Sequence, residues 1–162
     1  MTRYWLFKSE PSTFSFEDLQ RAPKQRSAWG GVRNHQARNL LRDQVAQGDG
    51  VLFYHSSAEP TGVAGIARVS GAARPDPTQF EPRSDGYDPK SRREAPTWVE
   101  VEIEAVRALP RFVQLAALKA HPGLARMLVV QRGQRLSIQP VEPAEWRLVL
   151  ELGGLERAAR RR

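Results

Sequence analysis

The feature that most constrains the fold is the segment TWVEVEIEAV at residues 97–106, in which apolar and acidic side chains alternate. Because successive side chains of a β-strand point to opposite faces, Val99, Val101 and Ile103 are predicted to face a core. The opposite face carries one tryptophan and three glutamates, namely Trp98, Glu100, Glu102 and Glu104. A strand with one buried face needs partner strands, so the chain is expected to build a sheet.

The glutamates on this strand could serve as carboxylates in acid–base chemistry. However, 21 of the 25 basic residues of the chain are arginines, which favours an ion-paired or solvated sheet face instead. Trp98 lies on the same polar face. A tryptophan is unusual there unless a helix, a loop or a ligand covers it.

Hydrophobic periodicity predicts further elements on both sides of this strand. Four more strands are predicted, at residues 3–9, 51–56, 62–71 and 135–141. Helices are predicted at residues 16–21, 34–47 and 112–120, and residues 143–152 could form a helix or a strand. Five prolines indicate a long loop at residues 72–96. The pattern favours an α+β fold with a mainly β core, a small curved sheet or barrel flanked by helices.

Composition limits the classes of function. The length of 162 residues fits one compact domain, and the mean hydropathy of −0.54 is that of a globular protein without an apolar run of membrane-spanning length. The absence of cysteine excludes disulfides, a thiolate nucleophile and cysteine-bound metals. The three histidines are scattered. We therefore expect no metal, no cofactor and no membrane association, and a cytoplasmic monomer.

The net charge of +7 is compatible with a polyanionic partner. Part of it comes from the C-terminal sequence LERAARRR, which has four arginines and one glutamate. We expect a folded domain at residues 1–152 and a basic, flexible tail at residues 153–162. Charge of this kind does not by itself indicate nucleic-acid binding, because electrostatic attraction is independent of sequence.

Signatures of catalysis are few. The chain has no Walker loop, no GxGxxG and no GxSxG motif. His55 and Ser56 are neighbours on a predicted strand, so they point to opposite faces and cannot form a nucleophile–base pair. Lys8, Ser9 and Glu10 bring an amine, a hydroxyl and a carboxylate to the end of the first predicted strand.

The segment WGGVRNHQARNLLR at residues 29–42 joins a tryptophan, two glycines and a basic amphipathic helix. Such a segment could hold a flat, partly charged ligand such as a nucleobase with its phosphate. It could equally be a turn, a core tryptophan and a solvated helix face. The residues alone leave both interpretations open.

Six ordered blocks together resemble the EVE domain family. They are YWLFKSEP (4–11), WGGVRNHQARNLLR (29–42), GDGVLFYHS (48–56), GVAGIARV (62–69), PTWVEVE (96–102) and RLSIQPV (135–141). The resemblance implies a PUA-like fold, a bent and mostly antiparallel β-barrel flanked by helices. It also implies a non-enzymatic reader that binds a modified nucleobase in DNA or RNA, as the related YTH, ASCH and PUA domains suggest.

The resemblance turns several polar and aromatic residues into candidates for the site. Trp29 would form the aromatic wall for an extruded base, and Gly30 would let the backbone approach it. The candidates for contact with the base are Ser9, Glu10, Trp29, Gly30, Asn34, Tyr54, His55, Ser56 and Trp98. The candidates for contact with the flanking phosphate are Arg33, Arg38 and Arg42. Alternation places Tyr54 and Ser56 opposite His55, so these three are not all expected in one pocket. Trp5 and Trp146 are predicted to be core residues.

An enzyme remains the alternative function. ASCH relatives include amidohydrolases, and Lys8 or Glu10 could act as nucleophile or base on a modified nucleoside. Their closeness along an extended chain leads us to expect that they do not both face one substrate.

Overall fold

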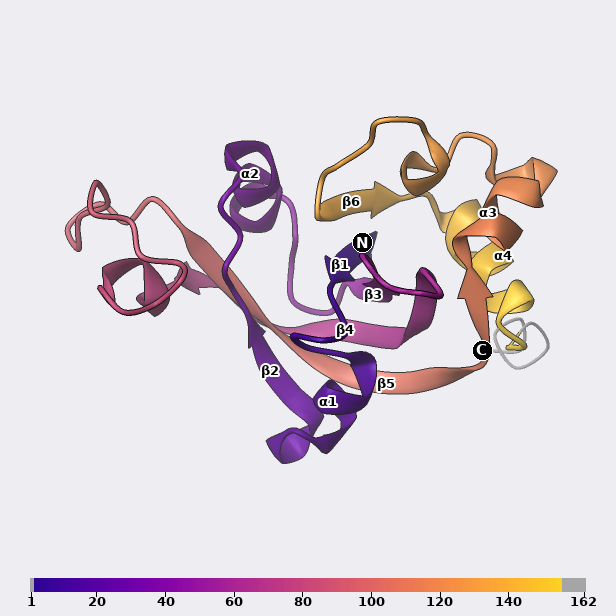
Figure 1. Ribbon diagram of the computed structural model, residues 1–162, viewed down its shortest axis with the longest axis horizontal. Coiled ribbons are helices and arrows are strands. Elements are labelled where there is room, and N and C mark those ends of the chain that lie inside the picture. The colour runs from indigo at the N-terminus through magenta and orange to yellow at the C-terminus, as the bar shows by residue number, and fades with distance from the viewer. Residues whose placement is uncertain (1, 156–162) are drawn as a thin grey trace.

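The computed structural model describes residues 2–155, which form one curved sheet with helices on both of its faces (Figure 1). The strands are β1 (Tyr4–Ser9), β2 (Arg26–Trp29), β3 (Gly50–His55), β4 (Gly62–Pro75), β5 (Val99–Gln114) and β6 (Ile138–Val141). The α-helices are α1 (Phe16–Arg21), α2 (His35–Asp43), α3 (Leu115–Ala120) and α4 (Pro143–Leu152). Short 3-10 helices lie at Pro23–Gln25, Pro77–Phe80, Pro122–Leu124 and Leu128–Val130.

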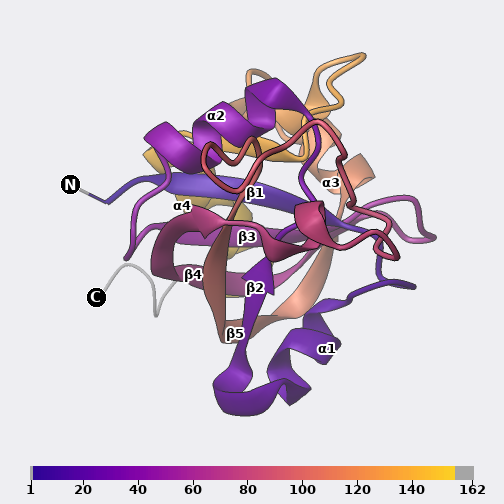
Figure 2. The same ribbon diagram turned by 90° about the vertical axis from the view of Figure 1, so that its left-hand side faces the viewer.

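The six strands are arranged in the order β2-β5-β4-β3-β1-β6. β1 pairs with β3 in parallel, and the other neighbouring strands are antiparallel. Long strands β4 and β5 bend strongly, with register shifts along their shared edge (Figure 2). The mostly antiparallel, bent sheet is as predicted. The prediction of a barrel is wrong in one respect, because the sheet is open, with β2 and β6 at its edges.

β5 is longer than the sequence predicts. The expected helix at residues 112–120 begins only at Leu115, because Val113 and Gln114 still pair with β4. Gly62 makes this pairing possible, since a Cβ at that position would lie 2.1 Å from the carbonyl oxygen of Val113. β4 likewise continues to Pro75, four residues past the predicted end, because β5 offers it partners through a series of bulges.

Strand β2 was not predicted. It has four residues, and only Trp29 among them is buried, so its hydrophobic pattern is too short to read. Pairing with the glutamate-bearing part of β5 makes it a strand: Arg26 lies opposite Glu104 and Ala28 opposite Glu102. This edge strand carries Trp29 to one side of the pocket described below.

Each face of the sheet has its own core. Trp5, Phe7 and Phe53 lie in a first core with α1 and α2, whereas Leu6 and Leu52 lie in a second core with α3 and α4. β1 and β3 are therefore buried on both faces, as the unbroken apolar run of residues 51–54 predicts.

The glutamate face of β5 is ion-paired, as predicted. Glu100 bonds Arg74 at 2.7 Å, and Glu104 bonds Arg68 at 3.0 Å. Val101 and Ile103 on the opposite face are fully buried in the first core. The carboxylates of this strand therefore hold neighbouring strands together.

The folded part extends past residue 152. Leu155 is buried in the second core, and the carbonyl oxygen of Gly153 accepts a hydrogen bond from the amide of Arg111. The expected flexible tail thus cannot begin at residue 153, while residues 156–162 lie outside the described part of the chain. None of the described helices is long and apolar enough to cross a membrane.

Candidate nucleobase pocket

A pocket of about 410 Å³ opens where the end of β1, the end of β2 and the residue before β6 meet. Its polar and aromatic lining includes Lys8, Ser9, Glu10, Thr13, Phe14, Ser27, Trp29, Arg33 and Ser137. Small or backbone surfaces complete it at Ala28, Gly30, Gly31 and Val32. The structure therefore brings together five of the predicted candidates: Ser9, Glu10, Trp29, Gly30 and Arg33.

Trp29 belongs to the core and to the pocket at the same time. Its ring packs on Phe7 and Phe53, with centroids 5.3 and 5.4 Å away, and only 7% of the residue is exposed. Its indole N–H has no hydrogen-bond partner within residues 2–155 and is still accessible to solvent. Both interpretations of the sequence hold in part: the ring is core, and the N–H is a free donor on a residue that lines the pocket.

Lys8 and Glu10 both line the pocket, which corrects the expectation that they do not face one substrate. The reason is that residues two apart on an extended chain point to the same side. The amine of Lys8 donates to the carbonyl oxygen of Gln134 at 3.2 Å, and burial lowers its pKa. The Glu10 side chain is exposed and has no partner in the described chain. Ser9 donates its hydroxyl hydrogen to the carbonyl oxygen of Phe14.

The two glycines after Trp29 are required by the carboxylate of Asp76. A Cβ on Gly30 would lie 2.9 Å from Asp76 Oδ2, and the amide of Gly31 donates to the same oxygen at 2.8 Å. Gly31 also has a φ of +76°, a conformation that other residues rarely adopt. The buried carboxylate of Asp76 therefore fixes the backbone turn beside the pocket.

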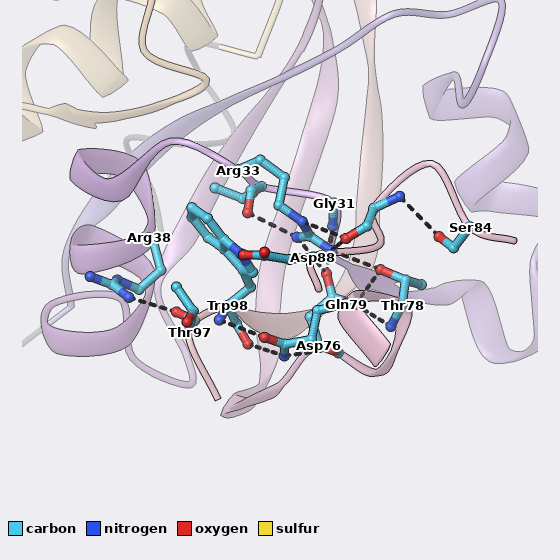
Figure 3. Close-up of polar contacts among 12 residues, drawn as sticks. Gly31, Arg33, Arg38, Asp76, Thr78, Gln79, Ser84, Asp88, Thr97 and Trp98 are labelled. Carbon is cyan, nitrogen blue, oxygen red and sulfur yellow. Dashed lines mark hydrogen bonds and ion pairs between the residues drawn. The ribbon is translucent and has the colours of Figure 1, made fainter. Parts of the chain in front are cut away.

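Arg33 has a structural role instead of the predicted contact with phosphate. Its guanidinium donates five hydrogen bonds, which is its full capacity. The acceptors are Asp76 Oδ2, Thr78 Oγ1 and the carbonyl oxygens of Val32 and Gly86 (Figure 3). With no N–H left, Arg33 ties the turn after β2 to residues 76–86.

Asp76 is the centre of this network and is fully buried. Burial raises the pKa of its carboxyl, but hydrogen bonds from Gly31, Thr78 and Arg33 together outweigh burial and leave the pKa below its usual value. The acid is thus held as a carboxylate that accepts hydrogen bonds from three residues on two segments, the turn after β2 and the 3-10 helix at Pro77–Phe80.

Trp98 lies outside the pocket. Its indole N–H donates to Asp88 Oδ2 at 2.8 Å, and its ring packs on His35 with centroids 4.8 Å apart. Arg33 and Arg38 lie over the same ring. A helix and a loop therefore cover Trp98, as its polar position requires, and this burial argues against contact with a base (Figure 3).

The other residues expected to contact phosphate or a base edge near α2 also have protein partners. Asn34 caps α2, because its side-chain oxygen accepts the amide of Ala37 at 2.9 Å. Arg38 donates to the carbonyl oxygen of Thr97, and Arg42 pairs with Asp43. Helix α2 ends at Asp43, short of the predicted residue 47, and none of these side chains lines the pocket.

The three candidates from β3 and its end do not line the pocket either. Tyr54 is buried in the second core, on the far face of the sheet, and burial raises its pKa to about 12. His55 Nε2 accepts the amide hydrogen of Phe16 at 3.1 Å, and burial lowers the pKa of this imidazole. The amide of Ser56 donates to the carbonyl oxygen of Ser9. Tyr54 and His55 point to opposite faces, as alternation predicts.

Sequence reasoning missed the lining residues Thr13, Phe14, Ser27 and Ser137. Thr13 and Phe14 come shortly after Glu10, so the polar residues at the end of β1 indicate this part of the chain as part of the site. Ser137 comes from the far end of the chain and is placed by pairing of its carbonyl oxygen with the amide of Lys8. No pattern in the sequence indicates that contact. Within residues 2–155 no cluster of His, Asp or Glu could hold a metal ion.

Comparison with known proteins identifies the family. The EVE domain matches residues 3–152. Human thymocyte nuclear protein 1 is 40% identical over 168 residues, which cover 94% of this chain and 74% of that protein. A solved protein from Pseudomonas putida, 44% identical, superposes with a TM-score of 0.88 over 93% of this chain and 99% of that one.

The structure of human thymocyte nuclear protein 1 (THYN1) in complex with 5-methylcytosine-containing DNA superposes with a TM-score of 0.89 at 40% identity, over 94% of this chain and 98% of that chain. A YTH domain from Zygosaccharomyces rouxii has a TM-score of 0.54 at 16% identity, which shows a shared fold. The length and identity of these matches establish that the chain belongs to the EVE domain family.

Proposed function

We propose that this chain is a reader of modified DNA that holds an extruded, modified cytosine in the pocket beside Trp29. The human relative was solved with DNA that contains 5-methylcytosine, and its fold superposes on nearly the whole of this chain. A reader must lift its base out of the stack before it can tell a modified base from a plain one.

The observation that carries the proposal is the set of unpartnered polar groups around the pocket. The indole N–H of Trp29 and the carboxylate of Glu10 have no partners among the described residues, and both residues line the same cavity. A carboxylate can accept the amino hydrogens of cytosine, and an N–H can donate to its acceptors. The volume of about 410 Å³ lies within the ~300–1,000 Å³ of small-ligand sites.

The ring of Trp29 contributes an edge to this pocket more than a face, because Phe7 and Phe53 pack on it. Phe14 is half-buried and lines the same cavity, so it offers the aromatic surface against which a base can pack.

The test is a titration of the full chain with two DNA duplexes that differ in one 5-methylcytosine. The wild-type chain should bind the modified duplex more tightly. Replacing Glu10 with glutamine should weaken binding of both duplexes by about 1–3 kcal/mol, the range for a lost contact to a base edge, because both cytosines carry the amino group that the carboxylate accepts. Glu81→Gln, an exposed glutamate outside the pocket, is the matched control. Equal affinities of the wild-type chain for both duplexes would contradict the proposal, and a matched RNA competitor shows whether DNA is preferred.

An amidohydrolase is the second candidate, and the lowered pKa of Lys8 favours it. A buried amine that loses its proton more readily can act as nucleophile or base, and Glu10 lies two residues away in the same pocket. The chain is incubated with free modified nucleosides and the mixture is analysed by chromatography. If a product forms with the wild-type chain but not with Lys8→Met, the chain is an enzyme. If the nucleosides stay unchanged, the reader function stands.

A further inference from the structure

The positive charge near α2 is already neutralised or bonded within the protein. Arg33 has no free N–H, Arg42 pairs with Asp43, and Arg38 is bound to Thr97 and Asn39. Binding of a DNA backbone needs cations that are free to contact phosphates, which then release their condensed counterions. Cations that are free in this sense lie on another surface of the molecule.

A second hollow, with a volume of about 590 Å³, lies between α3 and residues 129–135. Its three charged residues are all cations: Lys119, Arg132 and Arg135. All three are exposed, and none has an ion pair in the described part of the chain. We call this surface the basic groove and define it by these three residues.

The basic groove lies next to the nucleobase pocket. The amine of Lys8, in the pocket, donates to the carbonyl oxygen of Gln134, and Gln134 lines the groove. Ser137 lines the pocket only two residues after Arg135. One segment, residues 131–137, thus forms a wall of both cavities. In Figure 1 this segment leads into the start of β6, well away from the loop at residues 76–98.

From this placement we infer that the basic groove binds the phosphodiester backbone of DNA next to the extruded base, with Arg132 and Arg135 on successive phosphates. The inference rests on the proposed function for the identity of the polymer. A groove that has three free cations and no carboxylate attracts a polyanion, and its shared wall with the pocket places that polyanion beside the bound base.

The experiment measures the salt dependence of DNA binding by the full chain, with Arg132→Gln/Arg135→Gln against wild type. Each lost phosphate contact should make the slope of log K against log salt shallower by about 0.9, so by about 1.8 for two. Between ~50 and ~200 mM salt, wild-type affinity should then fall roughly tenfold further than that of the variant. The loss should be equal for modified and plain duplexes, because phosphate contacts carry no sequence information.

Two further variants separate charge at the groove from charge in general. Arg107→Gln/Arg147→Gln removes the same charge from exposed positions that line neither the pocket nor the groove, and its slope should stay near that of wild type. Arg132→Lys/Arg135→Lys keeps the charge and should keep the slope. A groove variant whose slope equals that of the Arg107/Arg147 control overturns the inference.

Failure of the proposed function gives a different result. If the wild-type chain binds modified and plain duplexes equally but the groove variant still loses slope, the pocket proposal fails and the groove stands. If the wild-type chain binds the modified duplex more tightly but the groove variant has the wild-type slope, the inference about the groove is wrong and the pocket proposal stands. A wild-type chain that binds no DNA overturns both.

Discussion

Trp29 is a single residue with two environments, so its substitutions should separate stability from binding. Truncation to alanine removes a ring packed on Phe7 and Phe53 and should cost about 3–5 kcal/mol of folding free energy. Phenylalanine keeps most of the packing but lacks the indole N–H. We expect Trp29→Phe to fold with a modest loss of stability and to bind both the modified and the plain duplex more weakly, because the two cytosines have the same acceptors for the N–H.

The measurement is a thermal melt of each Trp29 variant beside a titration with both duplexes. Trp146→Phe, a tryptophan stacked on Tyr4 away from the pocket, is the control for loss of an indole. If Trp29→Phe binds both duplexes as tightly as the wild type, the N–H has no part in binding the base.

Asp76 should make the stability of the protein depend on pH. Its folded-state pKa is lowered, so its contribution is present above the unfolded pKa of about 3.9 and is lost as the pH falls through the folded value. Asp76→Asn removes the charge that holds Arg33 and should cost about 3–5 kcal/mol at pH 7.

Denaturant unfolding at pH 7 and near pH 3 measures this effect. The variant should lose less stability than the wild type between the two pH values. Asp85→Asn, at an exposed carboxylate of the same loop, should behave as the wild type. A parallel loss in wild type and Asp76→Asn would show that Asp76 does not titrate with unfolding.

At the scale of elements, the loop at residues 76–98 is held by one buried amide. Gln79 donates to the carbonyl oxygens of Asp76 and Trp98 and accepts from Ser91 and from the amide of Trp98. Gln79→Ala would leave the amide N–H of Trp98 and the hydroxyl hydrogen of Ser91 without their acceptor, at about 1–3 kcal/mol for each buried group. We expect the loop to open and trypsin to cut it faster than in wild type, while Gln47→Ala, at an exposed position, leaves the rate unchanged.

The elements also show what the sequence could and could not predict. The alternation of β5 and the periodicity of the helix at residues 16–21 are local patterns, and the sequence predicts both correctly. β2 was missed because its strand character comes from pairing with β5 and not from its own four residues. The same limit applies to the site, where Ser137 reaches the pocket only through pairing of distant segments.

At the scale of the whole molecule, the net charge of +7 should make the proposed DNA binding sensitive to salt for any DNA sequence. Deletion of Arg160, Arg161 and Arg162 should lower affinity for plain duplexes and leave the ratio between modified and plain duplexes intact, because the pocket is formed by residues 8–33 and 137. Titrations of the truncated and full chains with both duplexes measure the two effects separately. A reduced ratio would place the tail in the site.

The pairing of β1 with β6 bears on how the protein is made. β1 leaves the ribosome long before its antiparallel partner, Ile138–Val141. Until then one edge of β1 has no neighbour and is open to pairing with other chains. Such distant pairing also slows folding, because the chain closes a long loop before it gains the contact. Because Ser137 directly precedes β6 and lines the pocket, the pocket is complete only after this strand has been made.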